Sequence, residues 1–329
     1  MFQFDSPIMS RFDSEFRNLK YVIRKSEYVL LFAHTRPDPD SIGANLALKE
    51  ALLRHGKRVD IACYDPCPDY LHPVIGTIDP FLHPDTIDAG SYDTVIASDS
   101  VDRGFHLFRD RISEDQVTAI IDHHPDIEVR ADIKILDTES SSASELIYDF
   151  FIATEEPFTP TIATSLLMGI LFDTGNFQHP NTRAKTMEAA SDLIRKGAKL
   201  KKIVETIFTN RDLSTLKIWG RALVKARIIP ENNMIVSALT EKDIDECQAS
   251  TEEVNQAIPL LNSVSDAKFA MLLVQKDPET IRASLRSDEE GAVDVSLLAK
   301  KFGGGGHAMA SGFEIKGRII ETELGWQIA

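Results

Sequence analysis

Cysteine is scarce in this sequence. The three cysteines, Cys63, Cys67 and Cys247, are an odd number without a paired framework, which indicates a reducing compartment rather than a disulfide-stabilised secreted fold. Cys63 and Cys67 lie four positions apart, but no second pair follows that would complete a zinc site made of cysteines. We therefore expect a cytoplasmic protein whose chemistry depends on other residue types.

Long apolar runs are also missing. None approaches the roughly 18 to 20 residues that a membrane-spanning helix needs, and residues 1–7 have neither the basic start nor the apolar core of a secretory signal. Of the 329 residues, 43% are hydrophobic and 26% are charged, the balance of a soluble globular protein. This length is comfortable for two domains and leaves little room for an added oligonucleotide-binding fold, membrane anchor or sensor domain.

Basic residues are fewer than acidic residues in this sequence. Lys and Arg number 36 against 51 Asp and Glu, and the net charge is −15. A protein that tracks long nucleic acid usually carries a basic face, because phosphate neutralisation dominates that affinity. This charge argues against long duplexes as partners, whereas metal ions and a few local cations can still hold a short polyanion.

The first part of the chain alternates short apolar runs with helical patterns. This alternation predicts a parallel sheet with helices on both faces. Ser41 is expected to cap a helix whose Leu46 and Leu53 face inward. The expected strands cover 28–33, 58–63, 94–98 and 117–121, and the expected helices cover 10–26, 41–55, 142–153, 161–172 and 182–196.

The pattern changes after Gly197, which is expected to stop a helix. A mixed helical stretch continues to about residue 227, and alternating strands follow. The expected strands cover 234–239, 268–274 and 280–286, with helices over 251–261 and 294–302. We predict an N-terminal domain over 1–190, a helical linker over 191–228, and a smaller C-terminal α/β domain over 229–329.

Acidic and histidine residues gather where three predicted strands end. In open parallel sheets ligands bind beyond the carboxyl ends of the strands, so these side chains are expected to meet at one edge. The helix over 161–172 brings Asp173 to its own end. The strand-end residues are His34, Asp38 and Asp40, then Asp99, then Asp122, His123 and His124.

This set of side chains suits two metal ions. Asp38 and Asp40 can diverge to different ions, Asp99 can bridge with its two oxygens, and histidine supplies nitrogen. The mixture of imidazole and carboxylate favours manganese, cobalt, iron or zinc over magnesium alone. Two ions about 3.5 to 4 Å apart can activate a bridging water and stabilise charge on phosphoryl oxygens. Each piece alone has a structural alternative: a turn with a helix cap, a strand end, a structural histidine pair, or a helix terminus with a glycine stop. Their shared order and location favour a metal site.

A second candidate site lies in the C-terminal part. Arg282 and Arg286 precede a helix, and the run Gly303-Gly304-Gly305-Gly306-His307 follows it. Consecutive glycines permit positive φ, and their N–H groups can form an anion-binding nest. Arg286 can hold a phosphate through two hydrogen bonds. The alternatives are a flexible glycine loop and a solvated strand face.

The acidic and histidine residues at the strand ends resemble the motifs of the DHH phosphoesterase superfamily. His34-x-x-x-Asp38-x-Asp40, Asp99, Asp122-His123-His124 and Asp173 occur in that family's order, over roughly residues 15 to 185. The resemblance implies that one ion, usually manganese, is held by His34, Asp38 and Asp99, and that the other is held by Asp40, Asp99, His123 and Asp173. It also implies that His124 faces the substrate phosphate or leaving group, so we expect catalytic roles for Asp99, Asp122 and His124.

The second candidate site, together with Gly312, resembles the DHHA1 domain of RecJ-like nucleases and nanoRNases over roughly residues 230 to 316. The resemblance implies that this domain binds the substrate across a cleft. The substrate-binding residues expected on this basis are Arg282, Arg286, Gly304, Gly305, Gly306 and His307.

Together the two resemblances imply a hydrolase with two divalent ions, most often Mn²⁺, of the nanoRNase and 3′-phosphoadenosine 5′-phosphate phosphatase group. The implied partners are short single-stranded oligonucleotides, linear dinucleotides or a nucleotide bisphosphate, with no long duplex and no membrane; a homodimer stays open. Two alternatives remain: a pyrophosphatase or exopolyphosphatase, and a catalytically dead nucleotide-binding sensor. Pyrophosphatases of this superfamily resemble a different second domain, and a sensor need not retain every metal ligand.

Overall fold

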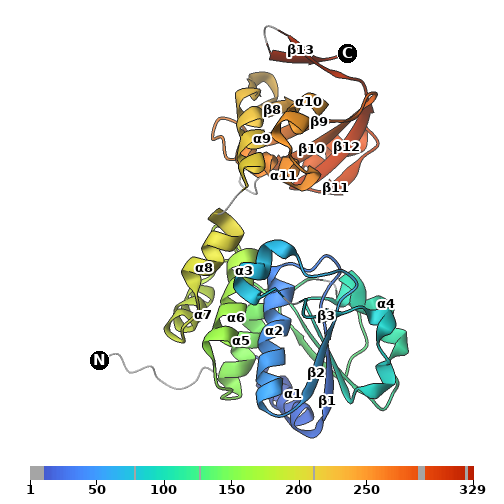
Figure 1. Cartoon of the computed structure of the whole chain (residues 1–329), viewed down its shortest axis with the longest axis vertical. Helices are drawn as coiled ribbons and strands as arrows, with labels where there is room; N and C mark the ends of the chain where they lie inside the picture. Colours follow the sequence, from blue (N-terminus) through green and yellow to red (C-terminus); the bar gives the residue numbers. More distant parts are fainter. Residues whose placement is uncertain (1–10, 78, 126, 210–211, 288–292, 323–324) are drawn as a thin grey trace. The chain divides into compact units, whose positions relative to one another are not determined.

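The computed structural model describes the chain except for residues 1–10, 78, 126, 210–211, 288–292 and 323–324 (Figure 1). The interpretation of residues 1–7 therefore lies outside the described residues. The chain forms two compact units, Met1–Asn210 and Arg211–Ala329. Within the described ranges, no helix is both long enough and apolar enough to cross a bilayer.

The first unit is built on a parallel sheet of six strands in the order β3-β2-β1-β4-β5-β6. The strand order reverses between β1 and β4, and such a switch point is where open α/β sheets bind ligands. The predicted parallel sheet is confirmed, but β3 and β6 were not predicted. The strands are β1 (Tyr28–Phe32), β2 (Arg58–Ala62), β3 (Phe81–Leu82), β4 (Thr94–Ser98), β5 (Val117–Asp122) and β6 (Ile133–Leu136).

Side chains of β1 alternate between two hydrophobic cores, as a sheet covered on both faces requires. Val29 and Leu31 pack under one group of helices, and Leu30 and Phe32 pack against the segment after β4, which includes α4 (His106–Phe108). Figure 1 shows α2, α5 and α6 on the side of the sheet opposite α4. The first group comprises α1 (Asp13–Lys25), α2 (Pro39–Arg54), α5 (Ala143–Ala153), α6 (Pro160–Asp173), α7 (Ala184–Arg195) and α8 (Leu200–Val204); a short α3 (His72–Ile75) follows β2.

Helices α2 and α6 cross closely because glycines face each other. A Cβ added to Gly43 of α2 would lie 2.2 Å from the backbone oxygen of Ser165 in α6. A Cβ added to Gly169 of α6 would lie 2.4 Å from Oδ1 of Asp40. The crossing therefore brings the first turn of α2 beside the last turns of α6.

Two details of the sequence analysis are wrong in α2. The helix begins at Pro39, and its N-cap is Asp38 rather than Ser41, because Asp38 Oδ1 accepts hydrogen bonds from the backbone N–H of Asp40 and of Ser41. The Ser41 hydroxyl instead accepts the N–H of His34.

Leu53 does not face inward. It is 50% exposed, while Leu48 and Leu52 are buried four positions apart on one face. One further residue rotates the side chain by about 100° on a helix of 3.6 residues per turn, which carries Leu53 away from the core. Leu46 is half-buried against the same core.

The second unit has a mixed six-stranded sheet in the order β11-β12-β10-β9-β8-β7 and a separate β13-β14 hairpin. Helices α9 to α12 pack on one face and α13 on the other, which confirms the smaller C-terminal α/β domain. The strands are β7 (Arg227–Ile229), β8 (Met234–Leu239), β9 (Phe269–Asp277), β10 (Thr280–Ser287), β11 (Gly305–His307), β12 (Ala310–Lys316), β13 (Ile319–Thr322) and β14 (Gly325–Ile328); the helices are α9 (Leu213–Val224), α10 (Glu241–Cys247), α11 (Thr251–Asn255), α12 (Ala257–Asn262) and α13 (Val295–Lys301).

Candidate metal centre

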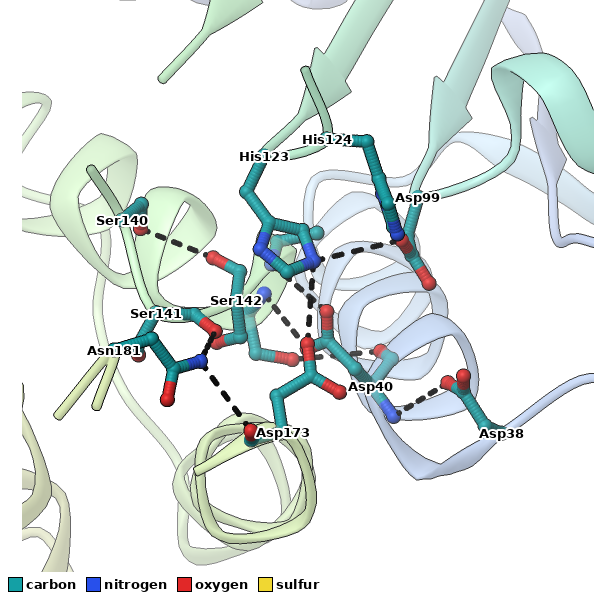
Figure 2. A network of polar contacts seen from close by, with 12 residues as sticks. Asp38, Asp40, Asp99, His123, His124, Ser140, Ser141, Ser142, Asp173 and Asn181 are labelled. Atoms are coloured by element: carbon teal, nitrogen blue, oxygen red, sulfur yellow. Dashed lines mark hydrogen bonds and ion pairs between the residues drawn. The ribbon is translucent and has the colours of Figure 1, made fainter. Parts of the chain in front are cut away.

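The carboxyl ends of β1, β4 and β5 carry the predicted ligands to one edge of the sheet. His34 follows β1, and Asp99 follows the neighbouring strand β4 at the switch point. Asp99 has φ 54, a left-handed conformation that non-glycine residues adopt uncommonly and often at functional sites. Figure 2 shows Asp38 and Asp40 at the start of α2 converging with Asp99, His123 and Asp173 from other elements.

The first ligand group consists of His34, Asp38 and Asp99. Nδ1 of His34 lies 2.7 Å from the carbonyl oxygen of Thr35, to which it donates in the neutral tautomer that leaves Nε2 as a ligand. Nε2 lies 3.1 Å from Asp38 Oδ2 and 3.3 Å from Asp99 Oδ2. Despite this proximity, Nε2 of His34 and Oδ1 of Asp99 are buried without a hydrogen-bond partner in the described part of the chain.

The second ligand group consists of Asp40, His123 and Asp173. His123 Nε2 lies 3.2 Å from Asp173 Oδ2 and 3.8 Å from Asp99 Oδ1, so His123 joins the two groups (Figure 2). Asp40 is fully buried, and its two oxygens accept the N–H groups of Ala143 and Ser144 at the start of α5, at 2.8 and 2.9 Å. The first turn of α5 therefore fixes the Asp40 carboxylate and complements its charge.

Burial and crowding of carboxylates set the electrostatics of the cluster. Burial, together with the charges of Asp173 and Asp99, raises the pKa of Asp40 well above its usual range. Burial also raises the pKa of Asp173. Burial alone would lower the pKa of His34 and of His123, but the surrounding carboxylates outweigh it and raise both pKa values to about 10. Divalent ions would supply the positive charge that these carboxylates otherwise draw from protons.

His124 is oriented by Asp122 at the end of β5. Asp122 Oδ1 lies 2.8 Å from Nδ1 of His124 and also accepts the His124 backbone N–H at 3.0 Å. These hydrogen bonds outweigh burial and lower the pKa of Asp122. His124 Nδ1 also lies 3.3 Å from Asp99 Oδ1, and its side chain is 43% exposed. Asp122 thus positions an imidazole that reaches the solvent side of the cluster.

The donor atoms fit divalent ions. Three overlapping groups of residues each place three donor atoms within 4.8 Å of one another. Asp99 belongs to two of these groups, and His123 also belongs to two. Buried nitrogen and oxygen atoms without hydrogen-bond partners, surrounded by carboxylates, are the environment that a divalent cation satisfies. The groups are His34, Asp38 and Asp99; Asp40, His123 and Asp173; and Asp99, His123 and His124.

Sequence reasoning missed a cation at this cluster. The guanidinium of Arg103 lies 3.5 Å from Asp99 Oδ1 and 3.8 Å from Asp38 Oδ2. Its position four residues after Asp99 was the available signal, because a short turn at the end of β4 can fold back over the same sheet edge.

The predicted substrate-binding residues lie in the second unit. Arg286 and His307 both pair with Ala310 of β12, so the three side chains share one face of the sheet. Arg286 and His307 are exposed, and Arg282 is exposed on the same strand beside Glu314.

Residues 305–307 form the edge strand β11 rather than the nest that the glycine run suggested. Glycine is required at position 304, just before β11, and at position 306 within it, because the backbone there lies very close to β12. A Cβ added to Gly304 would lie 2.1 Å from the Gly312 oxygen, and Gly306 has φ 135.

Comparison with known proteins identifies the class. Residues 28–170 match the model of the DHH family, N-terminal domain, and residues 231–324 match the model of the DHHA1 domain. The chain therefore belongs to the DHH/DHHA1 family, and the resemblance inferred from the motifs is confirmed.

Its relatives include proteins named as oligoribonucleases and phosphatases. The chain is 28% identical over 297 residues to the bifunctional oligoribonuclease and PAP phosphatase NrnA of Bacillus subtilis, a match that covers 87% of this chain and 89% of that protein. It is 26% identical over 294 residues to NrnA of Thermus thermophilus, covering 89% of this chain and 86% of the relative. A crystal structure of an exopolyphosphatase-related protein from Bacteroides fragilis shares the fold, with a TM-score of 0.79 and 23% identity over 94% of this chain and 93% of that chain.

Proposed function

We propose that the chain is a two-metal phosphoesterase that hydrolyses short oligonucleotides and nucleotide bisphosphates. One observation carries this proposal: the two oxygens of Asp99 face His34 of the first ligand group and His123 of the second. Such an arrangement suits a pair of ions that hold one phosphoester between them. The names of the NrnA relatives, which cover most of this chain, support the same class of substrate.

In this proposal His34, Asp38 and Asp99 hold one ion, and Asp40, Asp99, His123 and Asp173 hold the other. The bound ions would supply an activated water and stabilise charge on the phosphoryl oxygens. The chain itself orients His124 through Asp122. His124 is then placed to donate a proton to the leaving-group oxygen. Manganese is the ion we propose, because two imidazoles lie among the ligands.

Removal and replacement of the metal tests this function. We expect a chelator to abolish hydrolysis and Mn²⁺ to restore it better than Mg²⁺. The assay compares a linear dinucleotide, 3′-phosphoadenosine 5′-phosphate and inorganic pyrophosphate with the metal-stripped and reloaded protein. Preference for pyrophosphate would favour the pyrophosphatase alternative. Absence of turnover with every metal and substrate would favour a nucleotide-binding sensor, and full activity in Mg²⁺ without gain from Mn²⁺ would contradict the manganese assignment.

The proposal extends to the second unit, whose exposed Arg282, Arg286 and His307 would bind substrate together with Gly304, Gly305 and Gly306. Few cations are available in a chain of net charge −15. We therefore expect kcat/KM to peak for substrates of about two to five nucleotides, with a salt dependence equivalent to about one to three neutralised phosphates.

Labelled oligonucleotides of increasing length, assayed at several salt concentrations, measure both expectations. Arg286→Ala should reduce the salt slope by about 0.7, the value for one single-strand phosphate contact, and should leave metal content unchanged. Degradation of long strands at the rate of a dinucleotide would overturn the short-substrate assignment.

A further inference from the structure

Arg103 is a cation at the mouth of the metal centre that the proposed mechanism does not yet use. Its guanidinium reaches Asp99 Oδ1 and Asp38 Oδ2 at 3.5 and 3.8 Å, while 42% of its side chain remains exposed. Both distances exceed those of a direct hydrogen bond. The side chain therefore faces the ligand carboxylates on one side and solvent on the other.

The backbone beneath Arg103 is held firmly. The Arg103 carbonyl accepts the N–H of Thr35 at 2.6 Å, and its own N–H donates to Ser100 at 3.2 Å. The next residue, Gly104, has φ 129, and an added Cβ would lie 3.3 Å from Thr35 Cγ2. The turn after β4 is thus tied to the residue that follows His34, and it projects the guanidinium toward the same cluster.

Charge decides what the guanidinium does once ions are bound. Arginine stays protonated at every physiological pH, so Arg103 keeps its positive charge when a metal ion binds nearby. Ions held by His34, Asp38 and Asp99 would neutralise the carboxylates that Arg103 now approaches. Its planar set of N–H donors, which matches phosphate oxygens, would then be available on the solvent side.

His124 approaches the same atom of the cluster. Its Nδ1 lies 3.3 Å from Asp99 Oδ1, and its side chain is 43% exposed, nearly the same fraction as that of Arg103. The first unit therefore presents two exposed donor side chains beside one oxygen of Asp99, the carboxylate that would contact both ions in the proposed function.

We propose that Arg103 binds the non-bridging oxygens of the scissile phosphate and helps to neutralise the charge that develops on them during hydrolysis. This inference rests on the proposed function and assigns to the first unit a phosphate-binding residue of its own. The recognised chemistry is a phosphate monoester or diester group, independent of the base.

The test compares Arg103→Ala and Arg103→Lys with Arg54→Ala, which removes the same charge from the exposed far end of α2. Three quantities are measured: manganese content, the equilibrium affinity of the manganese-loaded protein for inorganic phosphate, and kcat/KM for a dinucleotide. We expect Arg103→Ala to keep its manganese and to lose about 10- to 150-fold in phosphate affinity and in kcat/KM, the loss of one charge-assisted contact.

Arg103→Lys should recover part of that loss, because a lysine supplies the charge without the planar pair of donors. Added guanidinium should rescue Arg103→Ala and leave Arg54→Ala unaffected. Wild-type phosphate affinity in Arg103→Ala, with a change confined to manganese affinity, would show that Arg103 balances the charge of the ligands, and would overturn the proposal. Phosphate binding can be measured without turnover. If Arg103→Ala loses phosphate affinity but the wild type hydrolyses no substrate, the phosphate-binding role of Arg103 is supported and the proposed hydrolytic function is refuted.

Discussion

Asp99→Asn is expected to remove most of the bound metal and to lower kcat/KM by about 10³-fold or more, or roughly 4 kcal/mol of transition-state stabilisation. The two oxygens of Asp99 lie 3.3 Å from His34 Nε2 and 3.8 Å from His123 Nε2. An asparagine keeps the size of the side chain but loses its charge and replaces one oxygen with an NH₂ group. In the proposed arrangement Asp99 would be a ligand of both ions, so both ions would lose that ligand in Asp99→Asn.

Metal content by mass spectrometry and steady-state kinetics measure this result together. Asp110→Asn is the matched control, since Asp110 is exposed in the same connection after β4. Folding of Asp99→Asn is checked by circular dichroism, so that loss of metal is separated from loss of structure. Near-normal turnover and metal content in Asp99→Asn would show that this carboxylate does not bridge two ions.

Most of the candidate metal centre could be predicted because its residues follow strand ends directly. His34, Asp99 and His123 each come within two residues of a strand that the apolar pattern reveals. Parallel strands bring such positions together whatever the rest of the chain does. The short spacing from Asp38 to Asp40 added two more candidate ligands without any tertiary information.

The contacts that fix these ligands could not be predicted. Asp40 is held by the N–H groups of Ala143 and Ser144, which are more than 100 residues away. Arg103 reaches the cluster through a kinked turn whose Arg103 and Gly104 have non-helical φ and ψ, and propensity does not specify such a turn. Both features depend on tertiary packing.

Two edge strands, β3 and β11, were missed for a different reason. β3 has two residues, and β11 is a run of Gly-Gly-His without a hydrophobic side chain. Period-two alternation needs at least four residues to be recognised, so these strands are defined by pairing with a neighbour. Gly304, just before β11, and Gly306 within it indicate close packing against β12 rather than freedom of the chain.

The second large effect is expected for Gly43→Ala. The added methyl would lie 2.2 Å from the backbone oxygen of Ser165 and 3.2 Å from its carbonyl carbon. Because backbone rather than a flexible side chain occupies that space, α2 and α6 must move apart. Overpacking of this kind costs about 3 kcal/mol, the upper end of its usual range. The shift would also separate Asp40 of α2 from Asp173 of α6, so bound metal and hydrolysis should fall together with stability.

Gly220→Ala is the matched control: it is the same substitution, but we expect it to leave stability and activity intact. Gly220 is exposed in helix α9, and nothing lies within 4 Å of an added Cβ. Alanine is favoured over glycine in a helix interior by up to about 1 kcal/mol, so this variant should be slightly stabilised and fully active. Thermal unfolding followed by circular dichroism, with metal content and kcat/KM measured on the same samples, compares the two variants. An unchanged Tm and full activity in Gly43→Ala would mean that the close crossing of α2 and α6 does not set the spacing of Asp40 and Asp173.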